Sequence, residues 1–300
     1  MKKIKLFSLL AVSLVVLGAC SSNSQKVTKP ASQKEETTKK VDNKKEKAEK
    51  DAGVLLDAIF STDDVKFKKV YGETYEDWSD EVIAVQTSAK IKEDGLSPAA
   101  DYSVQWSNDF PVETPEETIS GVLEVRRSLY QKIGDYEIKE VKVDDSGDSA
   151  TVTFSSKKLH SKGLASATRD VLTTLIGGID NLAEYNKAGS TETVKRYQTL
   201  LSYWIFRHLY RNDFAIYSNV DPNLAHVPLT AGEFETEIKL TKDKEGNWLI
   251  SQDDYKTLLS ELLDNTEGYD TIDRSGISTY KSKSGSVDDS VSKTKDKSSI

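Results

Sequence analysis

The chain has 300 residues and a formal net charge of −8 at pH 7, with 41 Lys and Arg against 49 Asp and Glu. Basic residues outnumber acidic ones in residues 1–50 and 281–300, so the body between these two segments is more acidic than the whole chain. An acidic body argues against nucleic acid as a partner, because nucleic-acid binding needs a basic surface. Cys20 is the single cysteine, which excludes an internal disulfide.

The first residues have the layout of an export signal. Lysines at the start precede an apolar run from Leu6 to Leu17. This run is too short to cross a hydrocarbon core of roughly 30 Å, which takes a helix of about 20 residues. A basic start followed by a short apolar run is typical of a secretory signal peptide.

The apolar run ends in Leu-Gly-Ala-Cys at residues 17–20, which resembles the lipobox of Gram-positive bacterial lipoproteins. The resemblance implies a signal peptide at residues 1–19, cleavage between Ala19 and Cys20, and a diacylglycerol thioether with palmitate-type chains on Cys20. Two acyl chains hold a protein on a membrane stably, whereas one does not. The implied location is the extracytoplasmic face of the cell membrane. An ordinary signal peptide with a chance cysteine is the alternative.

Composition divides the rest of the chain into three parts. Residues 20–50 and 271–300 are rich in Ser, Lys and other polar residues, and such segments bury too little apolar surface to fold. We expect a flexible tether in the first segment and a disordered tail in the second. The basic tether either contacts anionic lipid or teichoic acid, or is a solvated linker. Residues 51–270 are expected to form one domain.

Helical periodicity dominates the first half of that domain. A helix is predicted near residues 44–60, and a capping box at Ser61 to Asp64 predicts a second, short helix. Thr74 is predicted to cap a third helix, and Tyr102, Trp106 and Phe110 suggest another one that runs to Asn108. The clearest helix covers residues 115–133, with Thr114 as its N-cap, Pro115 in its first turn and Glu117 completing a capping box.

The periodicity then changes to that of strands. Residues 136–143 and 150–154 predict a hairpin with its turn at residues 144–148. Two long helices are predicted at residues 164–187 and 191–212, with Gly177 and Gly178 allowing close helix packing. A second hairpin follows at residues 234–240 and 248–250, and Ser251 is predicted to cap a last helix. This order indicates an α+β fold with helices packed on an antiparallel sheet and an inserted pair of long helices.

The two hairpins, YEIKEVKVDDSGDSATVTF and EFETEIKLTKDKEGNWLIS, resemble those of the NTF2-like, cystatin-like superfamily and of uncharacterised Gram-positive lipoproteins with such a domain. The Lys-Glu-Gly-Asn-Trp-Leu-Ile ending is similar to the closing strand of that superfamily. The resemblance covers roughly residues 50–265 and implies a cone whose mouth holds a small molecule. The paired helices depart from the minimal fold of that superfamily.

Arg126 is the most informative polar residue. It falls within the apolar stripe of helix 115–133, beside Tyr130, and a buried guanidinium must be paired. Arg126 and Tyr130 are therefore candidate ligand-binding residues, with Arg126 as the anchor for an anionic group. The alternative is an internal ion pair, or a side chain that extends to the rim of the domain.

His208 and Trp204 are two further candidates for ligand binding. Both lie on an aromatic helix that is either buried on all sides or exposes one face to a partner. A lone histidine on an apolar face is also explained as a core residue. Neither the histidines nor Asp144 and its acidic neighbours have the spacing of a metal site, so no metal or cofactor is expected.

These features favour a non-enzymatic, membrane-anchored lipoprotein that binds a small ligand or a protein partner at the cell envelope. One alternative is an enzyme whose cavity is centred on Arg126 and His208. Another alternative concerns the signal peptide, because Ser13 to Ala19 (SLVVLGA) resembles the lipoprotein-leader fragments that act as mating pheromones in some bacteria.

Overall fold

The structure is a computed structural model that describes residues 31–61, 64–97, 103–105, 107–189, 191–216, 220–266 and 273. The chain divides into two compact units, Met1–Lys40 and Val41–Ile300. Of the first unit, the structure describes only residues 31–40, which are helical. The signal peptide, Ala19, Cys20 and the pheromone-like segment therefore lie outside the described residues, as does the predicted tail apart from Asp273.

A four-stranded antiparallel sheet has the order β1-β2-β4-β5. Its strands are β1 (Tyr136–Val143), β2 (Ser149–Ser156), β4 (Phe234–Lys242) and β5 (Trp248–Leu249). Both predicted hairpins are therefore confirmed. Asp144 closes the first turn, because its Oδ1 accepts hydrogen bonds from the backbone N–H groups of Gly147, Asp148 and Ser149. A parallel pair, β3 (Leu159–His160) and β6 (Leu263–Asp264), is separate from this sheet.

Helix α1 (Ala31–Phe60) belongs to the core together with the four-stranded sheet. Ala48, Leu55 and Ile59 are fully buried on α1 and cluster with Val152 and Phe154 of β2. The helix begins earlier than the predicted residues 44–60, so part of the segment expected as a tether is helical. Alanine and lysine favour helices, and the buried Ala48 shows that packing contributes before residue 51.

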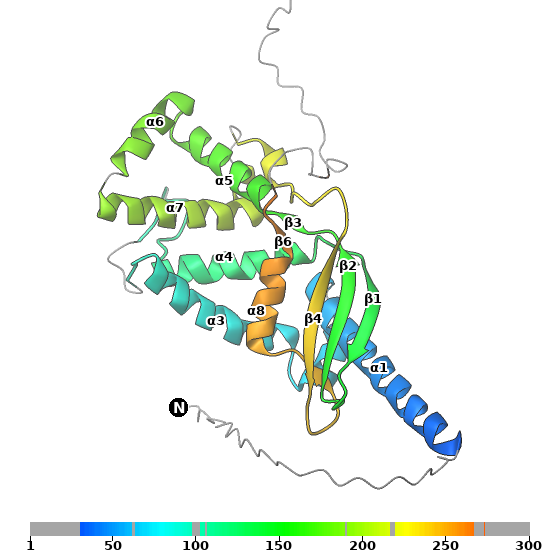
Figure 1. Cartoon of the computed structure of the whole chain (residues 1–300). Helices are drawn as coiled ribbons and strands as arrows, with labels where there is room; N and C mark the ends of the chain where they lie inside the picture. The colour runs from blue at the N-terminus through cyan, green and yellow to red at the C-terminus, as the bar shows by residue number, and fades with distance from the viewer. Residues whose placement is uncertain are drawn as a thin grey trace, which may run out of the picture. The chain divides into compact units, whose positions relative to one another are not determined.

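The remaining helices form the layers that carry the candidate site. Figure 1 shows α4 (Pro115–Tyr130) lying between α3 (Tyr75–Glu93) and α7 (Glu192–Tyr210), and α3 and α7 both contact α4. Helix α8 (Gln252–Glu261) contacts β4 and β6. The predicted caps are present, since Thr74, Thr114 and Ser251 each accept a hydrogen bond from the third residue after them. Thr114 and Glu117 also form the full capping box.

Three predictions need correction. The expected helix at 164–187 is two helices, α5 (Ser161–Leu175) and α6 (Ile179–Ala188), so the inserted pair is a trio. Gly177 and Gly178 separate them at φ values of 89° and 119°, where only glycine is free of strain. The glycines therefore break the helix rather than ease packing between two helices.

The other two corrections concern the segment before α4 and the start of α2 (Val65–Tyr71). Tyr102 and Trp106 lie outside the described residues, but residues 103–105 and 107–110 form no helix, and Val104 pairs with Glu113 in a β-bridge. The N-cap of α2 is Asp64, whose side chain makes no capping bond to its own helix. Its Oδ1 instead accepts a hydrogen bond from the backbone N–H of Tyr75 at 2.6 Å, which orients α3.

These elements confirm the predicted α+β class, with helices packed on an antiparallel sheet. Buried apolar side chains form two clusters. One is centred on α1, the sheet and α8, and the other on α3, α4, α5, α6 and α7. Helices α3, α4, α5 and α7 contribute residues to both clusters, so they join the sheet region to the helical layers.

Asp51 connects α1 to the second hairpin from a buried position. Its Oδ2 accepts hydrogen bonds from the backbone N–H of Trp248 and from Nζ of Lys47, both at 2.9 Å. We expect Asp51→Ala to lower the free energy of unfolding by about 1–3 kcal/mol, because the buried N–H of Trp248 loses its acceptor. Equilibrium urea unfolding measures this change. Glu49→Ala, at an exposed position of α1, is the control, and an equal loss in both variants would contradict this role of Asp51.

Candidate functional site

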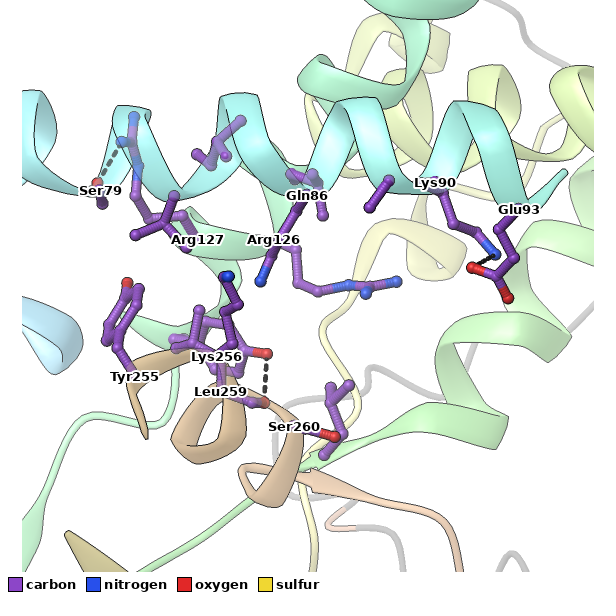
Figure 2. Close-up of a pocket in the computed structure, with 16 residues that line it drawn as sticks. Ser79, Gln86, Lys90, Glu93, Arg126, Arg127, Tyr255, Lys256, Leu259 and Ser260 are labelled. Atoms are coloured by element: carbon purple, nitrogen blue, oxygen red, sulfur yellow. Dashed lines mark hydrogen bonds and ion pairs between the residues drawn. The ribbon is translucent and has the colours of Figure 1, made fainter. Parts of the chain in front are cut away.

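A groove of about 310 Å³ lies between α3, α4 and α8 and reaches β6. Figure 2 shows side chains from α3 on one side and from α8 on the other. Its apolar lining comes from Val82, Ile83, Ala89, Leu123, Leu259 and Leu263. Its polar and aromatic lining comes from Ser79, Gln86, Lys90, Glu93, Arg126, Arg127, Tyr130, Tyr255, Lys256 and Ser260. No strand of the four-stranded sheet lines this groove, so it is placed differently from the cone mouth that the NTF2-like resemblance implied. We call it the α3–α8 groove.

Tyrosine hydroxyls hold α8 in position at the base of the α3–α8 groove. Tyr75 on α3 and Tyr255 on α8 share a buried hydrogen bond of 2.6 Å between their hydroxyls. The Tyr130 hydroxyl donates to the carbonyl oxygen of Leu259 at 2.7 Å. Burial raises the pKa of Tyr130 and of Tyr255 far above their usual range, so both hydroxyls stay protonated. Both hydroxyls therefore have structural hydrogen-bonding roles and hold α8 against its neighbours at the groove.

Most charged side chains around the groove are already paired. Arg127 donates from Nη1 to Asp80 and to Ser79, each at 2.6 Å, and so ties α4 to α3. Lys90 lies 3.1 Å from Glu93, and Lys256 lies 2.9 Å from Asp253. These pairs leave little net charge at the rim of the groove.

Arg126 differs from these groups. Its side chain extends into the space between α3 and α8, as Figure 2 shows, and it makes no hydrogen bond or ion pair with any residue that the structure describes. Its Nε is buried without a partner, and its guanidinium carbon lies 5.8 Å from the ring centre of Phe206 on α7. The internal ion pair that sequence reasoning left open is thus not formed within the described residues. A half-buried guanidinium without a carboxylate favours an anionic partner.

His208 and Trp204 lie elsewhere. Trp204 is fully buried among Phe110, Phe214 and His208, in the helical cluster rather than in the α3–α8 groove. The two ring nitrogens of His208 face Asp213 at 2.7 Å and Glu113 at 3.0 Å, and Glu113 also pairs with Arg207 at 2.6 Å. Both ring nitrogens of His208 therefore have partners, so the histidine is explained as a core residue.

The structure therefore brings Arg126 and Tyr130 together but does not bring His208 or Trp204 to them. The enzyme alternative required Arg126 and His208 to converge on one cavity, and neither cavity lined by Arg126 includes His208. The aromatic side chains in the second half of α7 are buried or half-buried, whereas the side chain of Tyr197 is exposed. Within the described ranges, no group of three or more His, Cys, Asp and Glu side chains could hold a metal ion.

Sequence reasoning missed the α8 side of the groove. Tyr255, Lys256 and Leu259 look like an ordinary amphipathic helix, and nothing local indicates which helix they face. The paired tyrosines Tyr75 and Tyr255 are separated by 180 positions along the chain. Their contact depends on how the second hairpin returns the chain toward α3.

Comparisons with known proteins identify no family. No family model matches the chain, and no curated protein matches it. One solved structure that is similar to part of this chain is from Bacillus subtilis subsp. subtilis str. 168, the ycdA protein described as a "putative lipoprotein". The identity is 15%, the TM-score is 0.44, and the alignment covers 74% of this chain and 58% of that one. The chain thus spans less than two thirds of the length of that structure, and a similarity this low establishes neither a shared family nor a shared activity.

The Glu113 network should make stability depend on pH. Burial disfavours the ionised form of Glu113, but the hydrogen bond from His208 and the charge of Arg207 outweigh this effect and lower the pKa below its usual 4.5. A carboxyl with a lowered pKa in the folded state contributes stability above its unfolded pKa and loses it as the pH falls through the folded pKa. We expect Glu113→Gln to lower the free energy of unfolding near pH 7 by about 1–3 kcal/mol, with a smaller difference below pH ~4.

Urea unfolding of the unaltered protein and of Glu113→Gln at pH 7, 5 and 3.5 measures the effect of this substitution. Glu124→Gln, an exposed position on α4, is the control and should change stability by less than about 0.5 kcal/mol. A Glu113→Gln deficit that stays constant across this pH series would contradict the account of the network.

Proposed function

We propose that this protein is a lipid-anchored, extracytoplasmic lipoprotein that binds a small anionic amphiphile in the α3–α8 groove without transforming it. The observation that carries the ligand proposal is the unpaired Arg126 guanidinium in a groove whose other charged side chains are mostly paired and whose lining includes six apolar residues. The lipobox resemblance at Cys20 supports the anchor. No family model matches the chain, so membership of the NTF2-like superfamily is part of this proposal and rests on the resemblance of the two hairpins.

The chemistry of the groove supports a ligand with one charged end. Leu123, Leu259 and Leu263 are among the apolar side chains that would cover a hydrocarbon portion, and burial of apolar surface contributes roughly 25 cal/mol per Å². The Arg126 guanidinium would donate parallel hydrogen bonds to a carboxylate or a similar anion. A volume of about 310 Å³ lies at the small end of the range for ligand pockets.

The state of the other polar groups supports binding rather than proton transfer. The hydroxyls of Tyr130 and Tyr255 are held in hydrogen bonds, and burial raises their pKa far from neutrality. Glu93 and Lys90 form an ion pair at the rim. General acid–base catalysis needs a group whose pKa lies near the working pH and whose proton can reach the substrate. The tyrosines at the base of the groove do not meet this requirement.

The proposed location at the cell membrane rests on residues 1–20, which resemble a lipoprotein signal peptide and lipobox. None of the helices that the structure describes is both long enough and apolar enough to cross a bilayer. The acyl chains on Cys20 would then provide the attachment, with two chains giving stable anchoring. The start of α1, in the segment of residues 31–40, would follow the anchored cysteine after a short connection.

Decanoate is a suitable probe for the groove, because it pairs a carboxylate with an apolar chain. We expect Arg126→Gln to weaken decanoate binding at least about tenfold, which corresponds to 1.4 kcal/mol, because the anion loses its charged donor. Binding of the neutral 1-decanol should change little. Isothermal titration calorimetry on the purified protein measures both affinities.

Lys92→Gln is the matched control, because it removes one positive charge from an exposed position of α3 outside the groove. It should bind decanoate like the unaltered protein. Equal weakening by Lys92→Gln, or Arg126→Gln binding decanoate as well as the unaltered protein does, would contradict the proposed role of Arg126.

Cys20→Ser tests the anchor. We expect this variant to incorporate no radiolabelled palmitate in the bacterial host and to leave the membrane fraction, because serine offers no thiol for the thioether. Membrane fractionation with immunoblotting measures the distribution. Ser22→Ala is the control and should remain labelled and membrane-bound. Membrane retention of Cys20→Ser at the level of the control would contradict lipid anchoring.

A further inference from the structure

A second cavity, of about 490 Å³, lies among α4, α5, α6 and α7, and we call it the α4–α7 cavity. Arg126 and Phe206 stand at its α4 and α7 sides, so Arg126 borders both this cavity and the α3–α8 groove. Figure 1 shows α5 and α7 running beside each other with α6 at their far ends. The break at Gly177 and Gly178 separates α6 from α5, and Leu182, Tyr185 and Asn186 of α6 line the cavity.

The charged lining of the α4–α7 cavity is entirely positive. Arg126, Arg169 and Lys195 come from three different helices, and none of the described lining residues is a carboxylate. None of the three side chains makes an ion pair with a residue that the structure describes. Asp170, next to Arg169 along α5, is not part of the lining, although its charge interacts with that of Arg169. Such a cluster is unexpected in a chain whose net charge is −8.

Two buried polar atoms in the same lining have no partner. They are Nε of Arg126 and the hydroxyl oxygen of Tyr185. Buried polar groups in folded proteins are normally hydrogen-bonded, so each unsatisfied group needs an explanation. Burial raises the pKa of Tyr185, which keeps its hydroxyl protonated and able to donate. Both atoms are therefore buried donors that no acceptor among the described residues satisfies.

We propose that the α4–α7 cavity binds the phosphate ester of a small polar molecule. Three cations match the charge and the several oxygens of a phosphate group better than they match a single carboxylate. Asn186, Gln198 and Thr199 on the cavity walls suit hydroxyl groups on the body of such a molecule. The proposal concerns a different ligand chemistry from that of the α3–α8 groove. Arg126 lines both cavities, whereas Arg169 and Lys195 line this cavity alone, so these two residues distinguish the proposals.

The phosphate ester could be part of a soluble molecule or the headgroup of a membrane lipid, and two probes separate these sources. The probes are sn-glycerol 3-phosphate and monomeric dihexanoyl-phosphatidylglycerol, titrated into the purified protein by calorimetry. Tighter binding of glycerol phosphate assigns the soluble source, and tighter binding of the lipid assigns the headgroup. Both results support a phosphate-ester site, and the absence of binding by both probes would overturn it.

Substitutions at the rim locate the site. We expect Arg169→Gln and Lys195→Gln each to weaken binding of the better probe at least about tenfold and Tyr185→Phe to weaken it severalfold, while decanoate binding stays unchanged. Affinity should also fall with added salt, because charges at the rim are screened. Lys187→Gln, an exposed position of α6 outside the cavity, is the control and should bind like the unaltered protein.

Circular dichroism and thermal unfolding confirm that each variant is folded, which is expected because Arg169 and Lys195 are exposed. Probe affinity that Arg169→Gln and Lys195→Gln leave unchanged, or that Lys187→Gln weakens equally, would overturn the proposal. Failure of this site with intact decanoate binding leaves the proposed groove function in place. Loss of decanoate binding with intact phosphate-ester binding would contradict the proposed groove function and leave the phosphate-ester site in place.

Discussion

The packing of α4 between α3 and α7 is the constraint on which both candidate cavities depend. Arg127 on α4 pairs with Asp80 and Ser79 on α3, and Arg207 on α7 reaches back to Glu113, just before α4 begins. These two contacts fix α4 from both sides. Arg126, directly before Arg127, then faces the space that the helices leave open, where no carboxylate of the described chain meets it. Two neighbouring arginines thus have different roles because the helix turns by 100° between them.

The same packing separates structural polar groups from those available to a ligand. His208, Glu113 and Asp213 satisfy one another inside the helical cluster. At the base of the α3–α8 groove, Tyr75 pairs with Tyr255, and Tyr130 donates to the carbonyl oxygen of Leu259. Their hydrogen bonds stabilise the framework. Two of the unpartnered buried donors, Arg126 Nε and the Tyr185 hydroxyl, belong to residues that line the α4–α7 cavity. A buried donor without an acceptor costs free energy, and a bound anion would recover it.

The sequence predicts the local structure correctly where that structure depends on a few adjacent residues. The capping box at Thr114 and Glu117, the turn at Asp144 and the alternation of both hairpins each depend on a few adjacent residues, and all are present. The prediction was wrong at Gly177 and Gly178, since a glycine pair is compatible with both close packing and a break. It also placed a helix up to Asn108 from aromatic spacing alone, where Val104 instead pairs with Glu113 in a β-bridge. The stripe position predicts that Arg126 faces the interior of the domain, but the absence of an ion pair depends on contacts among distant segments.

The central claim is that Arg126 is held unpaired so that it can bind an anion. The most direct measurement is the ¹⁵N–¹H signal of the arginine Nε groups by NMR during a titration with decanoate, with the signal assigned through its loss in Arg126→Gln. We expect the Arg126 signal to shift with saturation while the signal of Arg207, which is paired with Glu113 and lines neither cavity, stays nearly fixed. An Arg126 signal that does not move, or that moves no more than that of Arg207, would contradict this role of Arg126.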